Sequence, residues 1–435
     1  MRPLALLVAL CAFCSCGPSS PMGGAGGGGV AATGPTWAHD VAPLVSEHCS
    51  SCHAERGIAP FALETYAQAR PMAAAIARDV ESKKMPPWMP GGQTPALLHE
   101  RTLTAAQIAT FVAWSENGAP EGDPSRAAPL PPPEVVAFGS ADVATDIGAD
   151  YVPDTALADD YRCFLVELGV TEDRMAAAFQ VTPGNRKVVH HVVTTLYAGS
   201  SKAALQALDA QSPGPGWQCF GGAVPTGSTA DAVGSIGAWV PGVSAVRYPA
   251  GTGNRIPANA IAVMQIHYNL AGGHGPDRTR LTIELVPKTS GAALQPIVGL
   301  PLIRRNLEIP PSSMNVVQQN KFPATVWSSN RFPVDGDAWI IGVAGHMHLL
   351  GTRIELVRSD ATGDHTLLDI PAWDFHWQGT YYLQQAVQLK ATDAITIRCT
   401  YNNPGTAMVT WGEGTNDEMC FGTLQLVDKQ PPSPL

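Results

Sequence analysis

Charged residues are scarce in this sequence. Asp, Glu, Lys and Arg together make up 15% of its 435 residues, and the formal net charge is −10. The excess of basic residues that nucleic-acid binding requires is absent, and so is the dense negative charge of a disordered acidic tail. No internal stretch reaches the ~18 consecutive apolar residues of a membrane-spanning helix. The sequence therefore argues against a nucleic-acid partner and predicts a globular chain of about two to four domains.

Glycine and proline, in contrast, are abundant, with 43 and 38 residues, and hydrophobic residues make up 45% of the chain. This composition favours a turn-rich β protein with a sizeable core. After residue 135 the apolar residues fall in short runs separated by Gly, Pro and Asn, and helical patterns are scarce. We therefore predict a multidomain fold class with two all-β sandwich subdomains of jelly-roll-like type, at residues 137–288 and 289–435.

The first residues have the pattern of a secretory signal. Arg2 supplies a positive charge, an apolar run extends from Leu4 to Phe13, and small residues follow around Cys16. Residues 1–16 are therefore predicted to direct export to the periplasm or cell envelope. Two outcomes remain open, a lipid anchor at Cys16 and secretion without one. Residues 17–36, mostly Gly, Ser and Ala, are predicted to form a flexible tether.

Export makes disulfides possible for the cysteines of the mature chain. Four cysteines follow residue 150, and an even number can form two bridges. Pairing nearest neighbours predicts bridges from Cys163 to Cys219 and from Cys399 to Cys420.

The pattern CxxCH, typical of covalent c-type haem attachment, occurs once, from Cys49 through Cys52 to His53. Two thiols about one helical turn apart can each bond a haem vinyl group, and the imidazole of His53 can then reach the iron. No second CxxC outside the leader could complete a zinc site. The motif therefore predicts one covalently attached haem c.

Helical patterns surround this motif, so residues 37–118 are predicted to form a small all-α, cytochrome c-like domain. Apolar residues repeat every fourth position from Met72 to Val80, and Thr104 with Gln107 makes a capping box. The proline-rich segment 119–136 then serves as a semi-rigid linker to the β subdomains.

The sixth ligand of the haem iron is predicted to be Met85, because the two prolines after it fix an extended loop. Met89 and His99 are the alternatives. Haem c with His and Met ligands shuttles single electrons and has no open position for substrate. The domain is therefore predicted to be an electron carrier.

Histidines gather in three of the predicted strands. His190 and His191 are adjacent, His267 lies in a second strand, and His346 and His348 flank a methionine in a third. Residues two apart in a strand face the same side, so an HxH pair can bind one metal ion without distortion. Adjacent histidines can do so only if the strand bulges or the rings bind through different nitrogens.

The order of these motifs resembles the copper type II ascorbate-dependent monooxygenases, the family of peptidylglycine α-hydroxylating monooxygenase and dopamine β-hydroxylase. The resemblance rests on His-His, a His in Ile-His-Tyr-Asn, His-Met-His, and a Met in Asp417 to Cys420. Further agreement comes from Gly237 to Gly242, Asp374 to Gln378 and Cys399 to Asn403. The similarity spans roughly residues 150 to 430 and does not include the haem motif.

This resemblance implies two copper ions, one in each β subdomain, across a solvent-filled cleft. His190, His191 and His267 would bind the electron-transfer copper; His346, His348 and Met419 would bind the copper that activates dioxygen. Imidazoles support both copper oxidation states, and a thioether favours Cu(I). The partners implied are a small-molecule substrate, O2, and ascorbate or a redox-partner protein.

Some positions depart from the peptide hydroxylase. Its substrate-binding Arg, two residues before HxH, is replaced here by Ala344, and its Asn and Tyr after the ligand Met by Phe421 and Thr423. Amidation of peptides is therefore not expected. His376, Tyr381 and Tyr382 are candidates for the cleft wall or for packing.

We therefore predict an enzyme, a copper monooxygenase that hydroxylates a substrate C–H bond, with electrons from ascorbate or through the haem domain. The alternative is a non-catalytic copper and haem protein of the envelope that stores metal or relays electrons. A blue-copper oxidase is disfavoured, because such a site needs a Cys ligand and the late cysteines are assigned to a disulfide.

Overall fold

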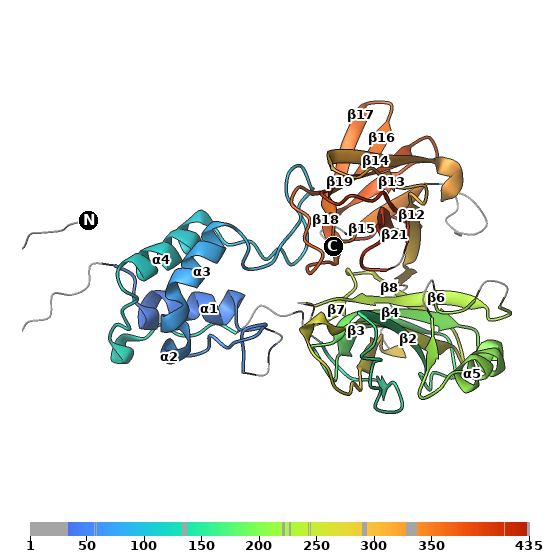
Figure 1. The fold of residues 1–435 in the computed structure, drawn as a ribbon, viewed down its shortest axis with the longest axis horizontal. Helices are drawn as coiled ribbons and strands as arrows, with labels where there is room; N and C mark the ends of the chain where they lie inside the picture. The colour runs from blue at the N-terminus through green and yellow to red at the C-terminus, as the bar shows by residue number, and fades with distance from the viewer. Residues whose placement is uncertain are drawn as a thin grey trace, which may run out of the picture.

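A computed structural model describes residues 34–432 apart from 56, 58, 133–135, 137, 220–221, 226–227, 242, 244, 289–293, 328–336 and 413. The predicted signal, Cys16 and nearly all of the predicted tether lie outside the described residues. The chain is mostly β-sheet with a few short helices: Figure 1 shows one helical unit beside two β units. In the described part of the chain, no helix has the length and apolar character needed to cross a membrane.

The helical unit packs around Trp37, Val41, Phe111 and Trp114, all buried. The predicted capping box is confirmed: the Thr104 hydroxyl accepts from the backbone of Gln107, whose side chain accepts in return from the Thr104 backbone. Its helices are α1 (Ala42–His48), α2 (Tyr66–Ala69), α3 (Ala73–Glu81) and α4 (Ala105–Glu116).

The proline-rich segment after α4 lies along the helical unit. The Trp37 N–H donates to the Pro120 carbonyl at 2.9 Å, and the Ala128 N–H to the Ala38 carbonyl at 3.0 Å. Proline has no N–H, but its carbonyl still accepts. The first part of the predicted linker is therefore held against the helices and does not hang free.

The first β unit consists of two sheets packed face to face over one apolar core. One sheet has the order β1-β10-β3-β8-β11, with β7 paired to β3, and the other has the order β5-β2-β9-β4-β6. The central strand β9 is buried on both faces along most of its length. The elements are β1 (Val143–Asp146), β2 (Asp159–Glu167), β3 (Arg174–Thr182), β4 (Val189–Tyr197), α5 (Lys202–Ala210), β5 (Trp217–Gln218), β6 (Ala232–Trp239), β7 (Val246–Arg247), β8 (Thr252–Ile256), β9 (Ile261–Asn269), β10 (Arg280–Leu285) and β11 (Gln295–Pro296).

The second β unit, orange to red in Figure 1, repeats this layering. One sheet has the order β12-β21-β15-β18, the other β14-β19-β16-β17, and β13 pairs with β20. Inward residues alternate strictly along β19, which is typical of a strand with one face on the core. The strands are β12 (Val298–Ile303), β13 (Glu308–Ile309), β14 (Ser313–Pro323), β15 (Ala338–His346), β16 (Gly351–Asp360), β17 (Gly363–Ile370), β18 (Thr380–Leu389), β19 (Ala394–Asn403), β20 (Val409–Thr410) and β21 (Phe421–Val427).

Both predicted disulfides are confirmed, one in each β unit: Cys163–Cys219 and Cys399–Cys420. The first lies in a small outer cluster with Trp217, and the second lies in the core of the second unit.

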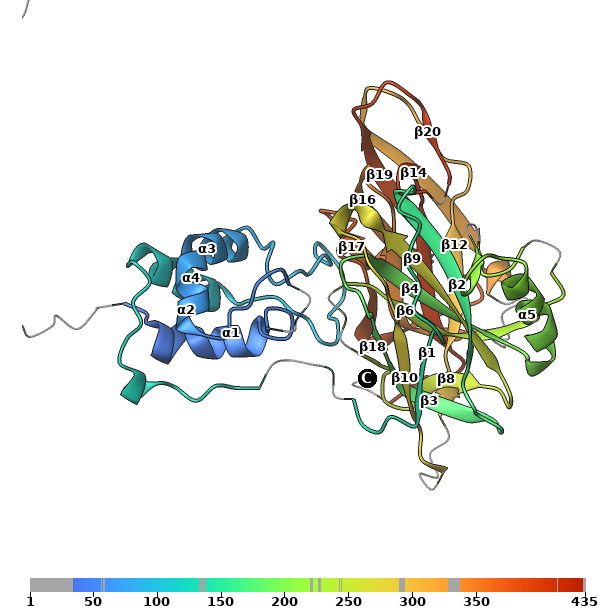
Figure 2. The ribbon, with the colours of Figure 1, turned by 60° about the horizontal axis from the view of Figure 1, so that its bottom comes forward.

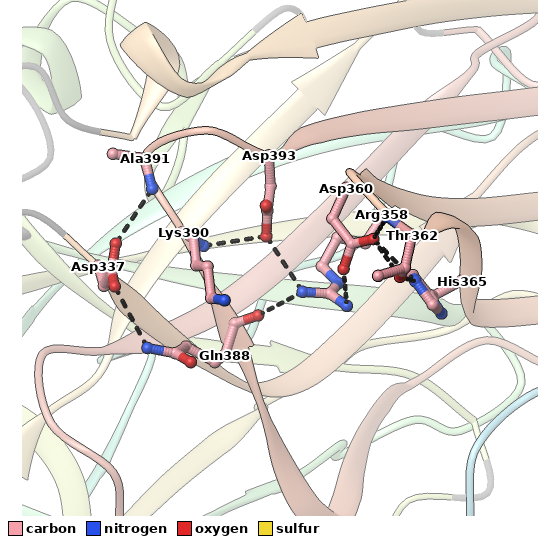
Figure 3. Close-up of polar contacts among 9 residues, drawn as sticks. All are labelled: Asp337, Arg358, Asp360, Thr362, His365, Gln388, Lys390, Ala391 and Asp393. Atoms are coloured by element: carbon pink, nitrogen blue, oxygen red, sulfur yellow. Dashed lines mark hydrogen bonds and ion pairs between the residues drawn. The ribbon is translucent and has the colours of Figure 1, made fainter.

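A polar network joins strands β16 to β19 of the second unit (Figure 3). Arg358 contacts Asp393 at 3.1 Å and Asp360 at 2.8 Å, and His365 contacts Asp360 at 3.1 Å. Hydrogen bonds, chiefly those from Thr362, hold the pKa of the Asp360 carboxyl below its usual range. His365 is thus committed to a turn and takes no part in the histidine groups described below.

The segment between α3 and α4 docks the helical unit onto the second β unit. Leu97 forms a bridge with Leu383 of β18 and is buried in the core of the second unit. The Leu98 N–H donates to the Tyr382 carbonyl at 2.8 Å, and the Gly91 N–H to that of Asp369 at 2.8 Å. Figure 2 shows the helical unit at one end of the paired β units. The helical unit and the second β unit are therefore held together by packing and hydrogen bonds as well as by the connecting chain.

Candidate functional site

The three histidines predicted in the first β unit come together. The pairing of β4 with β9 shifts register between Val189 and His191, a bulge at the adjacent pair. His191 lies directly opposite His267. Potential ligand atoms of His190, His191 and His267 lie within 4.8 Å of one another. The bulge thus supplies the backbone irregularity that two consecutive ligands require.

The donor atoms of this group fit a metal ion. Nε2 of His190 and Nδ1 of His267 are buried without a hydrogen-bond partner, which is unusual for buried polar atoms. The other nitrogen of His267, Nε2, contacts Asp159 Oδ1 at 2.8 Å. A carboxylate on one ring nitrogen orients the other toward a metal. His267 is therefore set to bind through Nδ1.

Burial keeps the imidazoles of His190 and His191 neutral, the form that binds metals. It lowers the pKa of His190 to about 3 and that of His191 well below its ordinary value. Burial alone would raise the pKa of Asp159, but hydrogen bonds led by that from His267 outweigh it and bring the pKa to about 2. A charged carboxylate thus stays beside His267.

We expect Asp159→Asn to weaken copper binding at the His190, His191 and His267 group by about 10- to 100-fold, the cost typical of losing a partner to a metal-binding His. Competition with a chelator measures this affinity. Asp173→Asn, which alters an exposed carboxylate paired with Arg255, is the control and should leave it unchanged. Equal affinities in all three proteins would contradict the role given to Asp159.

The second histidine pair lies at the end of β15. His346 pairs with Phe421 of β21, and Met347 points into the core, fully buried. His346 and His348 therefore share the opposite side, with ring centroids 5.1 Å apart. Nδ1 of His346 contacts Gln378 Oε1 at 2.6 Å and Nδ1 of His348 contacts the Asp417 carbonyl at 3.0 Å. Nε2 of each ring is left to bind a metal.

Burial also keeps this pair neutral. It lowers the pKa of His346 to about 4 and lowers that of His348. The neighbouring carboxylate Glu418 is buried too, and burial raises its pKa to about 7 against several backbone hydrogen bonds. Glu418 accepts from the N–H of His348 at 2.9 Å and of Leu350 at 2.6 Å. It thereby fixes the backbone that carries His348.

Met419 lines the same cavity as His346 and His348. Its neighbour Cys420 is fully buried and bonded to Cys399. The two side chains thus face opposite ways. The Tyr401 hydroxyl also donates to the Met419 carbonyl at 2.8 Å. The predicted ligand set of the second unit therefore lines one cavity.

Replacing Cys399 and Cys420 together with alanine should lower the free energy of unfolding by about 3 kcal/mol, the value expected for opening a loop of this length, since the two cysteines are 21 positions apart. Because Cys420 fixes the backbone beside Met419, copper binding in the second unit should weaken too. Denaturant unfolding and metal analysis measure both effects. The matched double replacement of Cys163 and Cys219 should lower stability but leave that copper bound.

Phe375 separates the two groups. Its ring stacks on His190 with centroids 4.6 Å apart and meets His348 edge-on at 5.8 Å. The rings of His190 and His348 are therefore no farther apart than the sum of these distances. Along this line the buried ring of Phe375 fills the space between the two histidine groups. Its neighbour His376 is exposed and contacts Asp374.

A cavity of about 1230 Å³ lies between the two β units. Its wall includes His191, His346, His348 and Met419, as well as Tyr381 and Tyr382. Burial raises the pKa of both tyrosines, so they remain protonated at neutral pH. One histidine of the first group and the whole second group thus face a space large enough for a small molecule.

The CxxCH motif forms a turn after α1. The N–H groups of Cys52 and His53 donate to the Cys49 carbonyl at 3.1 and 2.8 Å. Both thiols are free, in a chain whose other described cysteines are bridged. Nδ1 of His53 contacts the Phe61 carbonyl at 3.1 Å, which leaves Nε2 to bind a metal. Burial lowers the pKa of His53. The turn therefore offers the two thiols and the imidazole nitrogen that haem c needs.

The three candidates for the sixth haem ligand lie in different places. Met85 packs against the core of the helical unit, as Cys49 does. The sulfur of Met89 accepts a hydrogen bond from the Asp374 N–H at 3.3 Å, so Met89 packs against the second β unit. His99 lines the cavity between the β units.

A comparison with family models matches residues 301–425 to the model described as copper type II ascorbate-dependent monooxygenase, C-terminal domain. The match includes His346, His348 and Met419 but begins after the first histidine group and so does not include it. That family is copper-dependent and uses O2, ascorbate and a small-molecule substrate, and a domain of this kind implies an oxidoreductase. No curated protein matches the chain.

Solved structures with some likeness include the empty top component of Cowpea mosaic virus, at 9% identity and a TM-score of 0.26, covering 69% of this chain and 94% of that one. Another is the tandem CBM22 domain of Xyn10C from Paenibacillus barcinonensis, at 9% identity and a TM-score of 0.16, covering 67% and 94%. Likeness at these TM-scores supports no conclusion about this chain.

Proposed function

We propose that this chain is an exported copper monooxygenase that inserts one oxygen atom of O2 into a substrate C–H bond and reduces the other to water, using two electrons per turnover. The observation that carries the proposal is the group of His190, His191 and His267, in which Nε2 of His190 and Nδ1 of His267 are buried without a hydrogen-bond partner. The family match on the second β unit supports it.

In this proposal each β unit holds one copper ion: His190, His191 and His267 bind one, and His346, His348 and Met419 the other. Copper supplies one-electron redox chemistry, and a thioether ligand favours the reduced ion that reacts with O2. Asp159 holds the ring of His267 in one tautomer, and Gln378 does the same for the ring of His346. Phe375 packs between His190 and His348, and the cavity holds the substrate.

We further propose that the helical unit carries haem c on Cys49, Cys52 and His53, with Met85 as sixth ligand. Haem c supplies single-electron transfer. The docked segment between α3 and α4 holds this unit against the second β unit, and Cys52 lines the same cavity as the histidines. Electrons would come from this unit, from ascorbate or from a redox-partner protein. Export to the periplasm or envelope, with a possible lipid anchor at Cys16, completes the proposal.

Oxygen uptake by copper-loaded protein tests the enzymatic part. With a reductant present, addition of the substrate should accelerate oxygen consumption and yield one hydroxylated product per O2 consumed. A non-catalytic copper and haem protein would bind both metals and transfer electrons, but no organic compound would increase its oxygen uptake. That result would favour the alternative.

A further inference from the structure

The charged side chains around the cavity carry one sign. Arg101, Arg186, Arg247 and Arg305 line it, whereas among the described residues no Asp, Glu or Lys does. Most of the remaining wall is apolar or aromatic, and the chain as a whole has a net charge of −10. A cleft of one sign with low-dielectric walls concentrates ligands of opposite charge. The cavity is therefore suited to an anion with an apolar body.

Of these arginines, Arg305 is tied by backbone contacts to the segment that carries Met419. The residue before it donates its N–H to the Cys420 carbonyl at 3.0 Å, and Cys420 follows Met419. The Arg305 guanidinium lies over the ring of Trp411 at 5.4 Å. Trp411 in turn forms a bridge with Glu418, the other neighbour of Met419. Two chain segments thus place Arg305 and Trp411 next to a candidate copper ligand.

The positive charge of Arg305 is also free to bind an anion. Arg247 contacts the carboxylate of Glu284 at 2.6 Å. Arg305, in contrast, contacts the Trp411 ring, and no carboxylate in the described part of the chain pairs with it. A guanidinium that lies over an aromatic ring can still donate from its edge to a planar anion. Ala344, on the same cavity wall, offers no charge.

We propose that Arg305, supported by Trp411, binds the negative group of the substrate, and that the substrate is an organic carboxylate with an aromatic or aliphatic body. With its carboxylate bound to Arg305, the substrate would place its apolar part in the cavity, beside Met419, His346 and His348. This inference rests on the proposed function for what happens to the bound molecule. The binding of the anion needs only the residues of the cavity.

Calorimetric titration of the full chain with 3-phenylpropanoate and with its neutral amide tests the proposal. The carboxylate should bind more than about tenfold more tightly than the amide, since a hydrogen bond to a charged group is worth at least that factor. Arg305→Gln should remove this preference, and Arg305→Lys should keep part of it. Arg278→Gln is the control, because Arg278 pairs with Asp146 away from the cavity.

Equal affinity for the two probes, no binding of either at millimolar concentration, or an unchanged preference in Arg305→Gln would overturn the proposal. Copper content, measured on the same samples, separates this outcome from failure of the proposed function. A chain that binds two copper ions but shows no preference contradicts only the role of Arg305. A chain that still binds the carboxylate more tightly than the amide but binds no copper contradicts only the proposed monooxygenase function.

Discussion

His346→Ala should lower the copper content from two ions per chain to one and abolish most of the hydroxylation. The imidazole of His346 is half-buried, neutral and oriented by Gln378. No other described side chain is placed to replace it, so the ion of the second unit loses one of three ligands. The rate should fall more than about a hundredfold, because loss of a mere partner to a metal ligand already costs up to that factor. Metal analysis and product formation measure the two effects.

The matched control for this variant is His365→Ala. His365 lies in the same β unit but is committed to Asp360 in the network of Figure 3. That variant should keep both copper ions and the full rate. If His346→Ala retained two copper ions, or if His365→Ala lost one, the assignment of ligands in the second unit would be wrong.

His53→Ala should convert the haem from low spin to high spin and stop the supply of electrons through the helical unit. Nε2 of His53 is left available by the contact of Nδ1 with Phe61, whereas Cys49 and Cys52 would still hold the haem covalently. Turnover with a protein donor should fall at least about tenfold, equivalent to a barrier higher by ~1.4 kcal/mol. Turnover with ascorbate should persist. Absorption spectra and parallel assays with the two donors measure these effects.

His39→Ala is the control for the haem variant, because His39 is exposed on the same helical unit and its side chain contacts the neighbouring Asp40. It should leave spectrum and turnover unchanged. Unchanged turnover of His53→Ala with the protein donor would instead remove the helical unit from the electron path.

The candidate ligands could be predicted from the sequence because their spacing carries the information. HxH places two rings on one side of a strand, and the bulge that an adjacent pair needs is present at Val189 to His191. The partners of these rings could not be predicted. Asp159 is 108 positions from His267, and Gln378 is 32 positions from His346. They meet because β2 pairs with β9 and because a loop returns to β15, and no local pattern encodes either contact.

The fold shows the same division. Apolar runs predicted the strands, and nearest-neighbour pairing predicted both disulfides. The docking of the helical unit could not be predicted, because the segment around Leu97 has no regular apolar period. The contacts of Phe375 could not be predicted for a related reason: a single aromatic residue in a loop does not reveal which rings it will contact.

Metal analysis with EPR spectroscopy of the purified full chain tests the central claim most directly. We predict two copper ions per chain, each with a type 2 signal, with nitrogen couplings lost from one signal in His190→Ala and from the other in His346→Ala. A chain that binds no copper, or a single ion lost in both variants, would contradict the account of two separate copper sites.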